Sequence, residues 1–578
     1  MGIKLAQTAG FCMGVRRAVD IVLDITRNKG AEKIYTYGPL IHNPQTTELL
    51  EKRGIIPVET IDDIDGGTIV IRAHGISLEE RQRIKEKGLT IIDATCPKVA
   101  KVQAIIRKHA AQGYDIIIVG DKDHPEVTGL LGYSSGRGTV ITHPGDVKGL
   151  PPMEKVCVVA QTTQNSDEYG VMVEKIKKRF ADTVAFDTIC DSTEMRQAEI
   201  RSLASQMDAM VVVGGKNSAN TKRLAEISEE TGTPTFYVET ADELDRDLIN
   251  GYENIGVSAG ASTPNWIIDG VITYIAQHQD EKGQKELTTI YKLWTWAVRS
   301  DVYSAVGAGC LSLVGTYLQN LSLNVLNILT ASFYVFAMHT LNRLQDKNLG
   351  RIKGSFREKL YVRYKKAYFT VGTLSLIMAL VLSFMDGFVP LLILMFISGL
   401  GLLYNIKVFP PSWSVKRIGD IPGSKTIFIA AAWAIVTVVI PQAAVTVTVT
   451  PAMIVAMLFV FIIVFIKSAL SDIIDIQSDR LVGKETIPVV LGERNTLNLL
   501  RGISLFMVLI LAASFLLELT SSLSLILVIP IFYVWICIGL CDKRTQFSSI
   551  VLEGLLETGF IIAGVCSYLW SFLTNYAA

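Results

Sequence analysis

The stretch DIIIVGDKDHPEVTG, residues Asp115–Gly129, carries the pattern that decides the fold of the N-terminal half. A run of apolar residues predicts a buried strand, and the polar turn after it leads into a helical stretch. The same alternation extends outward in both directions, with strands predicted at Thr68–Arg72, Thr90–Ile92, Asp115–Gly120, Lys155–Ala160, Ala209–Gly215, Thr235–Val238 and Asn254–Ser258. Strands that alternate with helices predict an α/β fold with parallel sheets, in which ligands bind at the C-terminal ends of the strands.

The composition of the whole chain conceals two different halves. The 578 residues are 49% hydrophobic and 19% charged, with 55 basic and 55 acidic residues and a mean hydropathy of +0.36. That length predicts more than one domain, and the composition excludes a disordered chain, a collagen-like repeat and a small disulfide scaffold. Up to about Lys292 the charges are spread evenly, whereas long apolar stretches follow one another from about Trp294. The first half has no basic stripe, which argues against nucleic acid as a partner.

The N-terminal half is expected in the cytoplasm. Its first residues, MGIKLAQTAG, lack the apolar core of a secretory signal, and no span long enough to cross a bilayer precedes about residue 290. In a reducing compartment its cysteines are thiols or metal ligands rather than disulfides. The expected domains are residues 1–283 and 298–578, joined by a linker at 284–297.

The second half predicts an all-α membrane domain of nine transmembrane helices. The spans are Val298–Gln319, Asn324–Leu341, Tyr368–Met385, Val389–Tyr404, Thr426–Ile440, Ile454–Leu470, Leu497–Leu517, Leu523–Leu540 and Ile550–Phe572. Lys and Arg gather in the second, fourth, sixth and eighth connections, and the second, 342–366, has nine of them. Because cytoplasmic connections carry the excess of Lys and Arg, these connections are predicted on the same side as the N-terminal half. The sequence therefore predicts a multi-pass protein of the cell (inner) membrane.

Three turns of the first half each carry a cysteine. GFCMGV contains Cys12, DATCPKV contains Cys96 and DTICDST contains Cys190, a spacing that fits one cysteine from each of three α/β lobes meeting at a shared centre. Cys157 instead lies within an apolar strand and is expected to be a small buried side chain. Three thiolates without a fourth suit either zinc with an open position or an iron–sulfur cluster with one free iron, and spacing does not choose between them.

Polar side chains follow several of the predicted strands. They are His42, His74, His124, the segment Ser218–Asn220 and the segment Gly260–Ser262. Imidazole, hydroxyl, amide and backbone N–H donors in one set predict a pocket for an oxyanion such as a diphosphate. Glu126 is the carboxylate that the sequence places among these donors, which makes it the candidate proton carrier.

The ordered motifs GFCMGVRRAV, HNP, RAHGIS, DATCPKV, DHPEVTG, QTTQ, GKNSANT and SAGASTP resemble those of 4-hydroxy-3-methylbut-2-enyl diphosphate reductases, through about residues 1–280. The resemblance implies a three-lobed α/β reductase with a central [4Fe–4S] cluster on Cys12, Cys96 and Cys190. It implies that Glu126 with Thr162 delivers a proton, and that an external carrier such as ferredoxin or flavodoxin supplies electrons. It also implies that the diphosphate is bound by His42, His74, His124, Ser218, Asn220 and Ser262. The expected products are isopentenyl and dimethylallyl diphosphate. Open iron chemistry fits a reductive loss of water, which zinc does not supply.

An acidic segment follows the sixth predicted span. Asp472, Asp475 and Asp479 are spaced three and four residues apart, so a helix would place all three carboxylates on one face. With GKETIPVVLG downstream, the segment from about 290 to 578 resembles UbiA-type intramembrane prenyltransferases, in which such carboxylates hold Mg²⁺ against a prenyl diphosphate. The Tyr404–Lys407 segment, YNIK, agrees with that resemblance.

The other carboxylate motif of that family is incomplete in this chain. Family members show Asn-Asp-x-x-Asp-x-x-x-Asp after the second span, whereas this chain has Asn342, Arg343, Asp346 and Gly350. The second half is therefore an active prenyltransferase with altered metal use, in which Arg343 meets the diphosphate, or a diphosphate-binding or transport module, or an anchor for the reductase. The surviving Asp472, Asp475 and Asp479 favour the first of these over the anchor.

Overall fold

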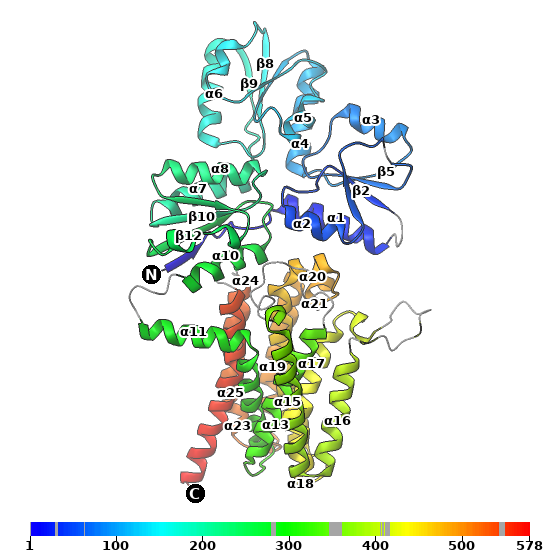
Figure 1. Cartoon of the computed structure of the whole chain (residues 1–578), viewed down its shortest axis with the longest axis vertical. Coiled ribbons are helices and arrows are strands. Elements are labelled where there is room, and N and C mark those ends of the chain that lie inside the picture. The colour runs from blue at the N-terminus through cyan, green and yellow to red at the C-terminus, as the bar shows by residue number, and fades with distance from the viewer. Residues whose placement is uncertain are drawn as a thin grey trace. The chain divides into compact units, whose positions relative to one another are not determined.

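The computed structural model divides the chain into two compact units, Met1–Glu281 and Lys282–Ala578. It describes residues 2–28, 33–62, 64–278, 285–345, 361–404, 406, 410, 417–542 and 549–577. The N-terminal unit contains the sheets and the C-terminal unit is a bundle of helices (Figure 1). Each unit has its own apolar core, so each is considered by itself.

The N-terminal unit consists of three lobes, each with a four-stranded parallel sheet. The first lobe has the order β3-β2-β4-β5, formed by β2 (Ile34–Tyr37), β3 (Ile55–Val58), β4 (Thr68–Ile71) and β5 (Thr90–Asp93). The second has the order β7-β6-β8-β9, formed by β6 (Asp115–Val119), β7 (Gly138–Ile141), β8 (Lys155–Ala160) and β9 (Asp182–Ala185). The third has the order β1-β12-β10-β11, formed by β10 (Ala209–Val213), β11 (Thr235–Val238), β12 (Asn254–Ala259) and the N-terminal β1 (Gly2–Leu5).

The three sheets share one connectivity. Within each lobe, the second strand along the chain forms one edge, followed by the first, the third and the fourth. In the third lobe the place of the fourth strand is taken by β1, which pairs with β12 from Gly2↔Asn254 to Leu5↔Val257. The first strands of the second and third lobes, β6 and β10, are almost fully buried because helices cover both faces of a parallel sheet.

The helices of this unit connect the strands, and several begin with identifiable caps. They are α1 (Met13–Asn28), α2 (Pro44–Glu51), α3 (Leu78–Glu86), α4 (Pro97–Ala111), α5 (Pro125–Leu131), α6 (Ser166–Arg179), α7 (Asp191–Ala204), α8 (Ala219–Glu230), α9 (Arg246–Ile249) and α10 (Asn265–His278). Proline occupies the first turn of α2, α4 and α5, where its missing N–H has no partner to lose. Ser77 forms a capping box with Glu80 at the start of α3.

The sequence-based prediction of parallel sheets is confirmed, and all seven predicted strands are present. Five short strands, β1, β2, β3, β7 and β9, were not predicted. Each has four residues and at least two side chains that are not buried, so its apolar run is too short to distinguish it from a loop.

The C-terminal unit is all-helical over its described residues. Its helices are α11 (Lys285–Arg299), α12 (Val302–Leu318), α13 (Val325–Gln345), α15 (Lys365–Asp386), α16 (Phe388–Leu403), α17 (Ser424–Ala434), α18 (Ile440–Val445), α19 (Pro451–Ile474), α20 (Ile476–Val482), α21 (Ile487–Leu491), α22 (Glu493–Leu516), α23 (Leu523–Ile526), α24 (Val528–Asp542) and α25 (Ser549–Ala577). A π-helical turn at Ile435–Val439 joins α17 to α18. Helix α11 lies on the segment expected as a linker.

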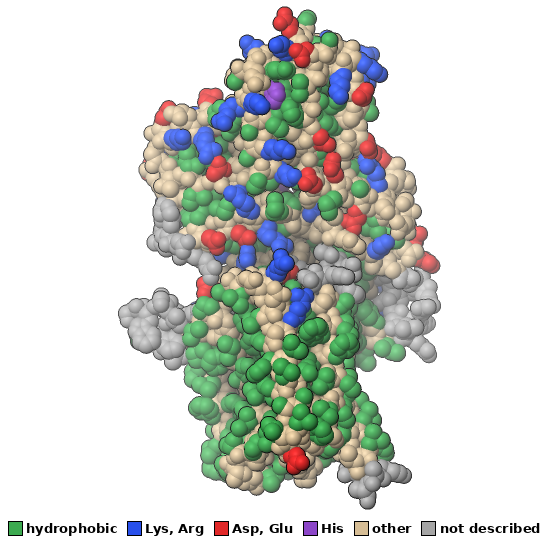
Figure 2. Space-filling view, turned by 180° about the vertical axis from the view of Figure 1, so that it is seen from behind, with side chains coloured by type: hydrophobic (Ala, Val, Ile, Leu, Met, Phe, Trp, Pro, Cys, Tyr) green, Lys and Arg blue, Asp and Glu red, His purple; other side chains and the backbone are tan. Residues whose placement is uncertain are grey.

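Seven of the nine predicted spans lie in helical segments long and apolar enough to cross a membrane. The first and fourth predicted spans lie in shorter apolar helices, α12 and α16, which have 17 and 16 residues. Over the parts of the chain that are described, the structure thus supports a multi-pass membrane domain, whereas the number nine stays a prediction. The surface of this unit is dominated by hydrophobic side chains, in contrast to the mixed charges of the N-terminal unit (Figure 2).

Candidate functional site

The equivalent strand ends of the three lobes supply the site residues predicted from sequence. After the first strand of each lobe come His42, His124 and the Ser218–Asn220 segment, and after the third come His74, Thr162 and Ser262. After the fourth strand come Cys96, Cys190 and Cys12, in the turns that lead into α4, α7 and α1. In a parallel sheet the C-terminal ends of all strands lie at the same edge. Because the connectivity repeats, each lobe supplies site residues after its first, third and fourth strands.

The three histidines lie against one another. The ring centroids of His42 and His74 are 4.5 Å apart, and His124 lies 5.6 Å and 5.5 Å from them. Burial lowers the pKa of all three imidazoles, and the pKa of His124 falls to about 4. Neighbouring imidazoles and Arg72 lower the pKa of His74 further, because each disfavours another positive charge nearby. Near neutral pH this group is therefore uncharged and each ring has one N–H to donate.

Several polar atoms around the histidines are buried without a partner among the described residues. They include Nε2 of His42, Nδ1 of His74 and Nδ2 of Asn220. An open pocket of about 590 Å³ lies beside them and is lined by His42, Asp121, Lys122, Asp123, His124, Pro125, Thr142 and Asn217. Buried donors that the fold leaves unsatisfied are costly, and an anionic ligand in the pocket would satisfy them. Ser218 caps α8, and the Ser262 hydroxyl donates to the carbonyl oxygen of His42 at 3.1 Å, which joins the third lobe to the first.

Glu126 lies in the first turn of α5 and is 2% exposed. Its carboxylate accepts from the backbone N–H of Thr162 at 2.7 Å and from the Thr162 hydroxyl at 2.8 Å. Burial raises the pKa of Glu126 to about 7 against the opposing effect of these two hydrogen bonds, and the charge of Asp121 raises it further. A carboxyl group that holds its proton near neutral pH can deliver it to a bound substrate.

The three cysteines are partly buried at helix N-termini. A Cβ built on Gly14 would lie 2.6 Å from Sγ of Cys96 and 3.9 Å from Sγ of Cys12, so α1 approaches both. Burial raises the pKa of the Cys96 thiol, and nearby Cys12 and Cys190 raise it too. Backbone N–H groups at helix N-termini favour the negative charge that a thiolate centre carries.

Two sets of side chains at these turns could hold a metal. Among the described residues, His42, His74 and His124 form a group of three potential ligands with donor atoms within 4.8 Å of one another. The three cysteines could hold either zinc with an open position or an iron–sulfur cluster with one free iron.

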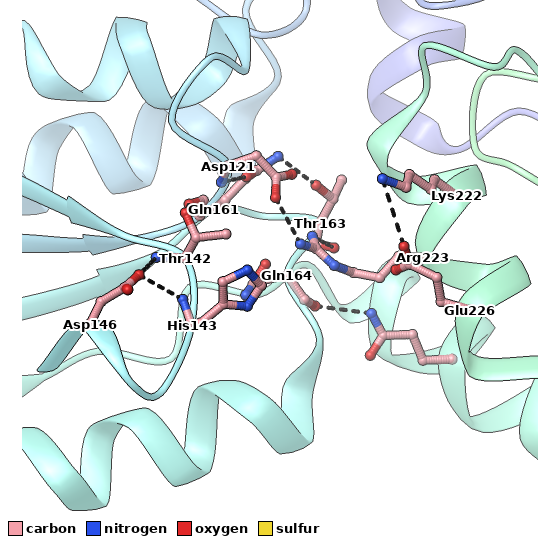
Figure 3. Close-up of polar contacts among 12 residues, drawn as sticks. Asp121, Thr142, His143, Asp146, Gln161, Thr163, Gln164, Lys222, Arg223 and Glu226 are labelled. Carbon is pink, nitrogen blue, oxygen red and sulfur yellow. Dashed lines mark hydrogen bonds and ion pairs between the residues drawn. The ribbon is translucent and has the colours of Figure 1, made fainter. Parts of the chain in front are cut away.

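Sequence reasoning missed several polar residues around this site. Asp121 lines the pocket, so Glu126 is not the only carboxylate near the donors as the sequence suggested. The Gln161 side chain accepts from the backbone N–H of Asp121 at 2.9 Å, and the Arg223 guanidinium donates to an Asp121 carboxylate oxygen at 3.1 Å (Figure 3). Arg223 is 102 residues from Asp121 in the chain, so no local pattern signals this pair.

In the C-terminal unit, Asp472 and Asp479 are buried and Asp475 is exposed. Asp475 separates α19, which ends at Ile474, from α20, which begins at Ile476. Helical hydrogen bonds continue through it, from the Asp475 N–H to the Ser471 carbonyl oxygen at 3.1 Å and from the Asp479 N–H to the Asp475 carbonyl oxygen at 2.9 Å, so one shared helix face stays a prediction. Asp472 pairs with Lys425 Nζ at 3.0 Å and accepts from the Thr426 hydroxyl at 2.9 Å. Oδ2 of Asp479 is buried without a partner among the described residues, which suits a cation ligand.

The incomplete first motif is only partly described. Oδ1 of Asn342 is buried and unpartnered among the described residues, whereas Asp346 and Gly350 lie outside them. Arg343 donates to Asp301 at 3.1 Å, and the Tyr361 hydroxyl donates to the other oxygen of Asp301 at 2.6 Å. The guanidinium of Arg343 thus has a protein carboxylate as a partner in the structure.

Fold and site together define a class: a three-lobed α/β protein with a thiol centre beside an anion pocket, joined to an apolar helical bundle. Residues 3–276 match the family model described as LytB protein, and residues 302–550 match that of the UbiA prenyltransferase family. The chain belongs to the 4-hydroxy-3-methylbut-2-enyl diphosphate reductase family through its N-terminal half and carries a UbiA prenyltransferase domain in its C-terminal half.

Similar proteins each cover about one half of the chain. A 4-hydroxy-3-methylbut-2-enyl diphosphate reductase of a Geobacter species is 46% identical over 283 residues, which is 49% of this chain and 99% of that protein. The reductase of Geobacter sulfurreducens is 42% identical over 282 residues. A solved reductase of Plasmodium falciparum is 31% identical with a TM-score of 0.45, covering 47% of this chain and 86% of its own. A UbiA homolog of Archaeoglobus fulgidus, solved with GPP and Mg²⁺, is 18% identical with a TM-score of 0.36, covering 47% and 99%.

Proposed function

We propose that the N-terminal unit reduces 4-hydroxy-3-methylbut-2-enyl diphosphate to isopentenyl and dimethylallyl diphosphate. The reaction takes two electrons and two protons and releases the hydroxyl group as water. The observation that carries the proposal is that the C-terminal strand ends of the three lobes supply a buried carboxyl with a raised pKa, three cysteines and a set of donors without partners among the described residues. Reductase relatives that align over 99% of their length support it.

The site residues fall into three groups in this proposal: those that bind the diphosphate, those that supply a proton and those that hold a cluster. The neutral His42, His74 and His124, with Asn220 and Ser218, donate hydrogen bonds to the diphosphate. Ser262 would join them by turning its hydroxyl from the His42 carbonyl oxygen to the diphosphate. Glu126, held by Thr162, gives its proton to the departing hydroxyl oxygen. A [4Fe–4S] cluster on Cys12, Cys96 and Cys190 would supply electrons and a Lewis acid, recharged by a carrier such as ferredoxin or flavodoxin.

Replacement of the cysteines tests the cluster assignment. Cys12→Ser, Cys96→Ser and Cys190→Ser should each lose the brown absorption, most of the bound iron and the reductase activity. Cys157→Ala is the matched control, because Cys157 is fully buried in β8 and faces the apolar core of its lobe. Full iron content and activity in any one of the three serine variants would contradict the proposed ligand set.

We propose for the C-terminal unit that Asp472 and Asp479, with Mg²⁺, bind the diphosphate of a prenyl donor whose chain is passed to an acceptor. The buried Oδ2 of Asp479, which has no partner in the described part of the chain, and the match to the UbiA family support this. Asn342, Asp346 and Asp475 would complete the metal and diphosphate contacts. Lys425 already offsets the charge of Asp472, and Arg343 is held by Asp301, so we expect fewer metal ions than the family motifs would bind.

The test uses purified full-length protein with Mg²⁺, labelled prenyl diphosphates of several lengths, and aromatic and lipid acceptors. Transfer should occur and should be lost in Asp479→Ala, while Glu518→Gln, an exposed carboxylate in the same unit, is the control. Magnesium-dependent binding without transfer would instead indicate a binding module. Neither binding nor transfer would indicate a membrane anchor.

The domain limits and the topology are proposals of the same kind. We place the reductase domain at 1–283, the linker at 284–297 and the membrane domain at 298–578. The Lys and Arg of the even-numbered connections support nine spans, with the reductase domain and both carboxylate motifs on the cytoplasmic side of the inner membrane.

A further inference from the structure

Arg223 lies on α8, the helix whose first turn contains Asn220. Its side chain is 12% exposed and its guanidinium makes two contacts with the second lobe (Figure 3). One N–H donates to Oδ1 of Asp121 at 3.1 Å, in the turn after β6, and another donates to the carbonyl oxygen of Thr163 at 2.9 Å, in the turn after β8. One side chain of the third lobe thus bridges two strand ends of the second.

Both contacted residues are neighbours of the proton-donor site. Thr163 follows Thr162, which holds the Glu126 carboxylate. Asp121 precedes His124 by three residues and lines the same pocket. Gln161 joins the two turns, because it accepts from the Asp121 backbone N–H and donates to the Thr163 hydroxyl, each at 2.9 Å.

From this geometry we propose that Arg223 is a positioning residue, which locks the lobe bearing Glu126 and His124 against the helix bearing Ser218 and Asn220. The proposal rests on the proposed reductase function. A substrate gripped by both lobes has its hydroxyl at the right distance from Glu126 only while the lobes keep their spacing, and a shift of about 1 Å can cost roughly a hundredfold in rate. Arginine suits this task because its planar group can hold two acceptors at once.

A solvent-exposed ion pair on the same helix does not connect the lobes in this way. Lys222, the preceding residue of α8, pairs with Glu226 at 3.8 Å within the same helix, and their side chains are 68% and 50% exposed (Figure 3). Such a pair contributes little because water screens it. Lys222 therefore provides a matched control that removes a cation from the same helix without touching the second lobe.

The Arg223–Asp121 ion pair also affects the pKa of Glu126. The charged or titratable groups near Glu126 among the described residues are Asp121, His124, Arg223 and Cys190. Cys190 lies next to the Glu126 site because its backbone N–H donates to the carbonyl oxygen of Thr162. Asp121 raises the pKa of Glu126, and Arg223 partly offsets the charge of Asp121. Removal of Arg223 should therefore raise the pKa of Glu126, and removal of the Asp121 charge should lower it.

The test measures kcat, KM and the pH profile of cluster-loaded, full-length protein with 4-hydroxy-3-methylbut-2-enyl diphosphate and a small-molecule reductant. The variants are Arg223→Ala, Arg223→Lys, Asp121→Asn and Lys222→Ala. Arg223→Ala should lower kcat about 10- to 100-fold and move the falling alkaline limb to higher pH. Asp121→Asn should move that limb to lower pH, Arg223→Lys should restore part of kcat, and Lys222→Ala should match the parent.

Iron content and absorption serve as the check on folding. A folded, cluster-loaded Arg223→Ala variant with parental kcat would overturn the proposal, and so would a lower kcat with an unmoved alkaline limb. If the parent protein itself, loaded with its cluster, does not turn over this substrate, the proposed function fails rather than the role of Arg223.

Discussion

At the scale of single residues, Glu126 shows how burial creates a proton donor. A shift of its pKa from 4.5 to about 7 means that ionising the carboxyl inside the fold costs about 3 kcal/mol more than in water. Because the folded-state pKa is the higher one, the stability that this group contributes is complete below pH 4.5. It is lost as the pH rises through 7. This loss of stability at higher pH follows from keeping a proton on Glu126, where the proposed reaction uses it.

Glu126→Gln removes the proton but keeps the size and the polarity of the side chain. We expect the cluster absorption and the iron content to stay at parental levels, and kcat to fall by roughly 10²–10⁴. Thr162→Val, which removes one of the two hydrogen bonds to the carboxylate, should cost much less. Parental turnover of Glu126→Gln in steady-state assays would assign the proton to another group.

The pH dependence of the reaction follows from the same residue. The protonated form of Glu126 is the active one, so kcat should fall as the pH rises through about 7. His124 should add no acid limb above about pH 5, because burial lowers its pKa to about 4. Measurement of kcat from pH 5.5 to 9 with saturating reductant checks both statements, and a rate that increases with pH across 7 would contradict the role of Glu126 as acid.

At the scale of elements, α12 approaches its neighbours closely at its glycines, most tightly at Gly315. A Cβ on Gly315 would overlap the carbonyl oxygen of Thr437, in the π-helical turn between α17 and α18. That oxygen belongs to a backbone that cannot rotate away, so a larger residue must push two helices apart. π-helical turns often mark positions where a helix adapts to a neighbour or to a function.

We expect Gly315→Ala to destabilise the membrane unit by about 1–3 kcal/mol. Gly399→Ala is the matched control, since Gly399 also lies in a helix, α16, and a Cβ there meets no described atom within 4 Å. Thermal unfolding of the detergent-solubilised protein should show a lower midpoint for the first variant only. Equal midpoints would show that α12 can shift without cost.

The elements also show what a sequence can reveal. Long apolar runs such as Ala209–Val213 identify the buried strands, because burial on both faces leaves no polar position. The one-residue interruption at Asp475 has no such signal, since apolar residues and i→i+4 hydrogen bonds both continue from α19 into α20. The partners of Asp472 and Asp121, Lys425 and Arg223, are 47 and 102 residues away, and such pairs arise only when the chain has folded.

At the scale of the whole molecule, the two units have separate cores. The apolar clusters of the N-terminal unit and the large cluster of the bundle share no residue. A protease site inserted between Glu281 and Lys282 should therefore release a soluble fragment that keeps its iron and its reductase activity. The parent protein treated with the same protease is the control. Precipitation or loss of activity on cleavage would show that the reductase unit needs the bundle.

The placement of the three cysteines has a consequence for the life of the protein in air. Each lies after the last strand of a different lobe, so a cluster on them would link all three lobes at one point. Destruction of that cluster by oxygen would remove the covalent link while leaving every sheet intact. The lobes would then be held by packing and by hydrogen bonds such as those of Arg223 and Ser262 alone, and we expect oxidised protein to be cleaved faster by cellular proteases.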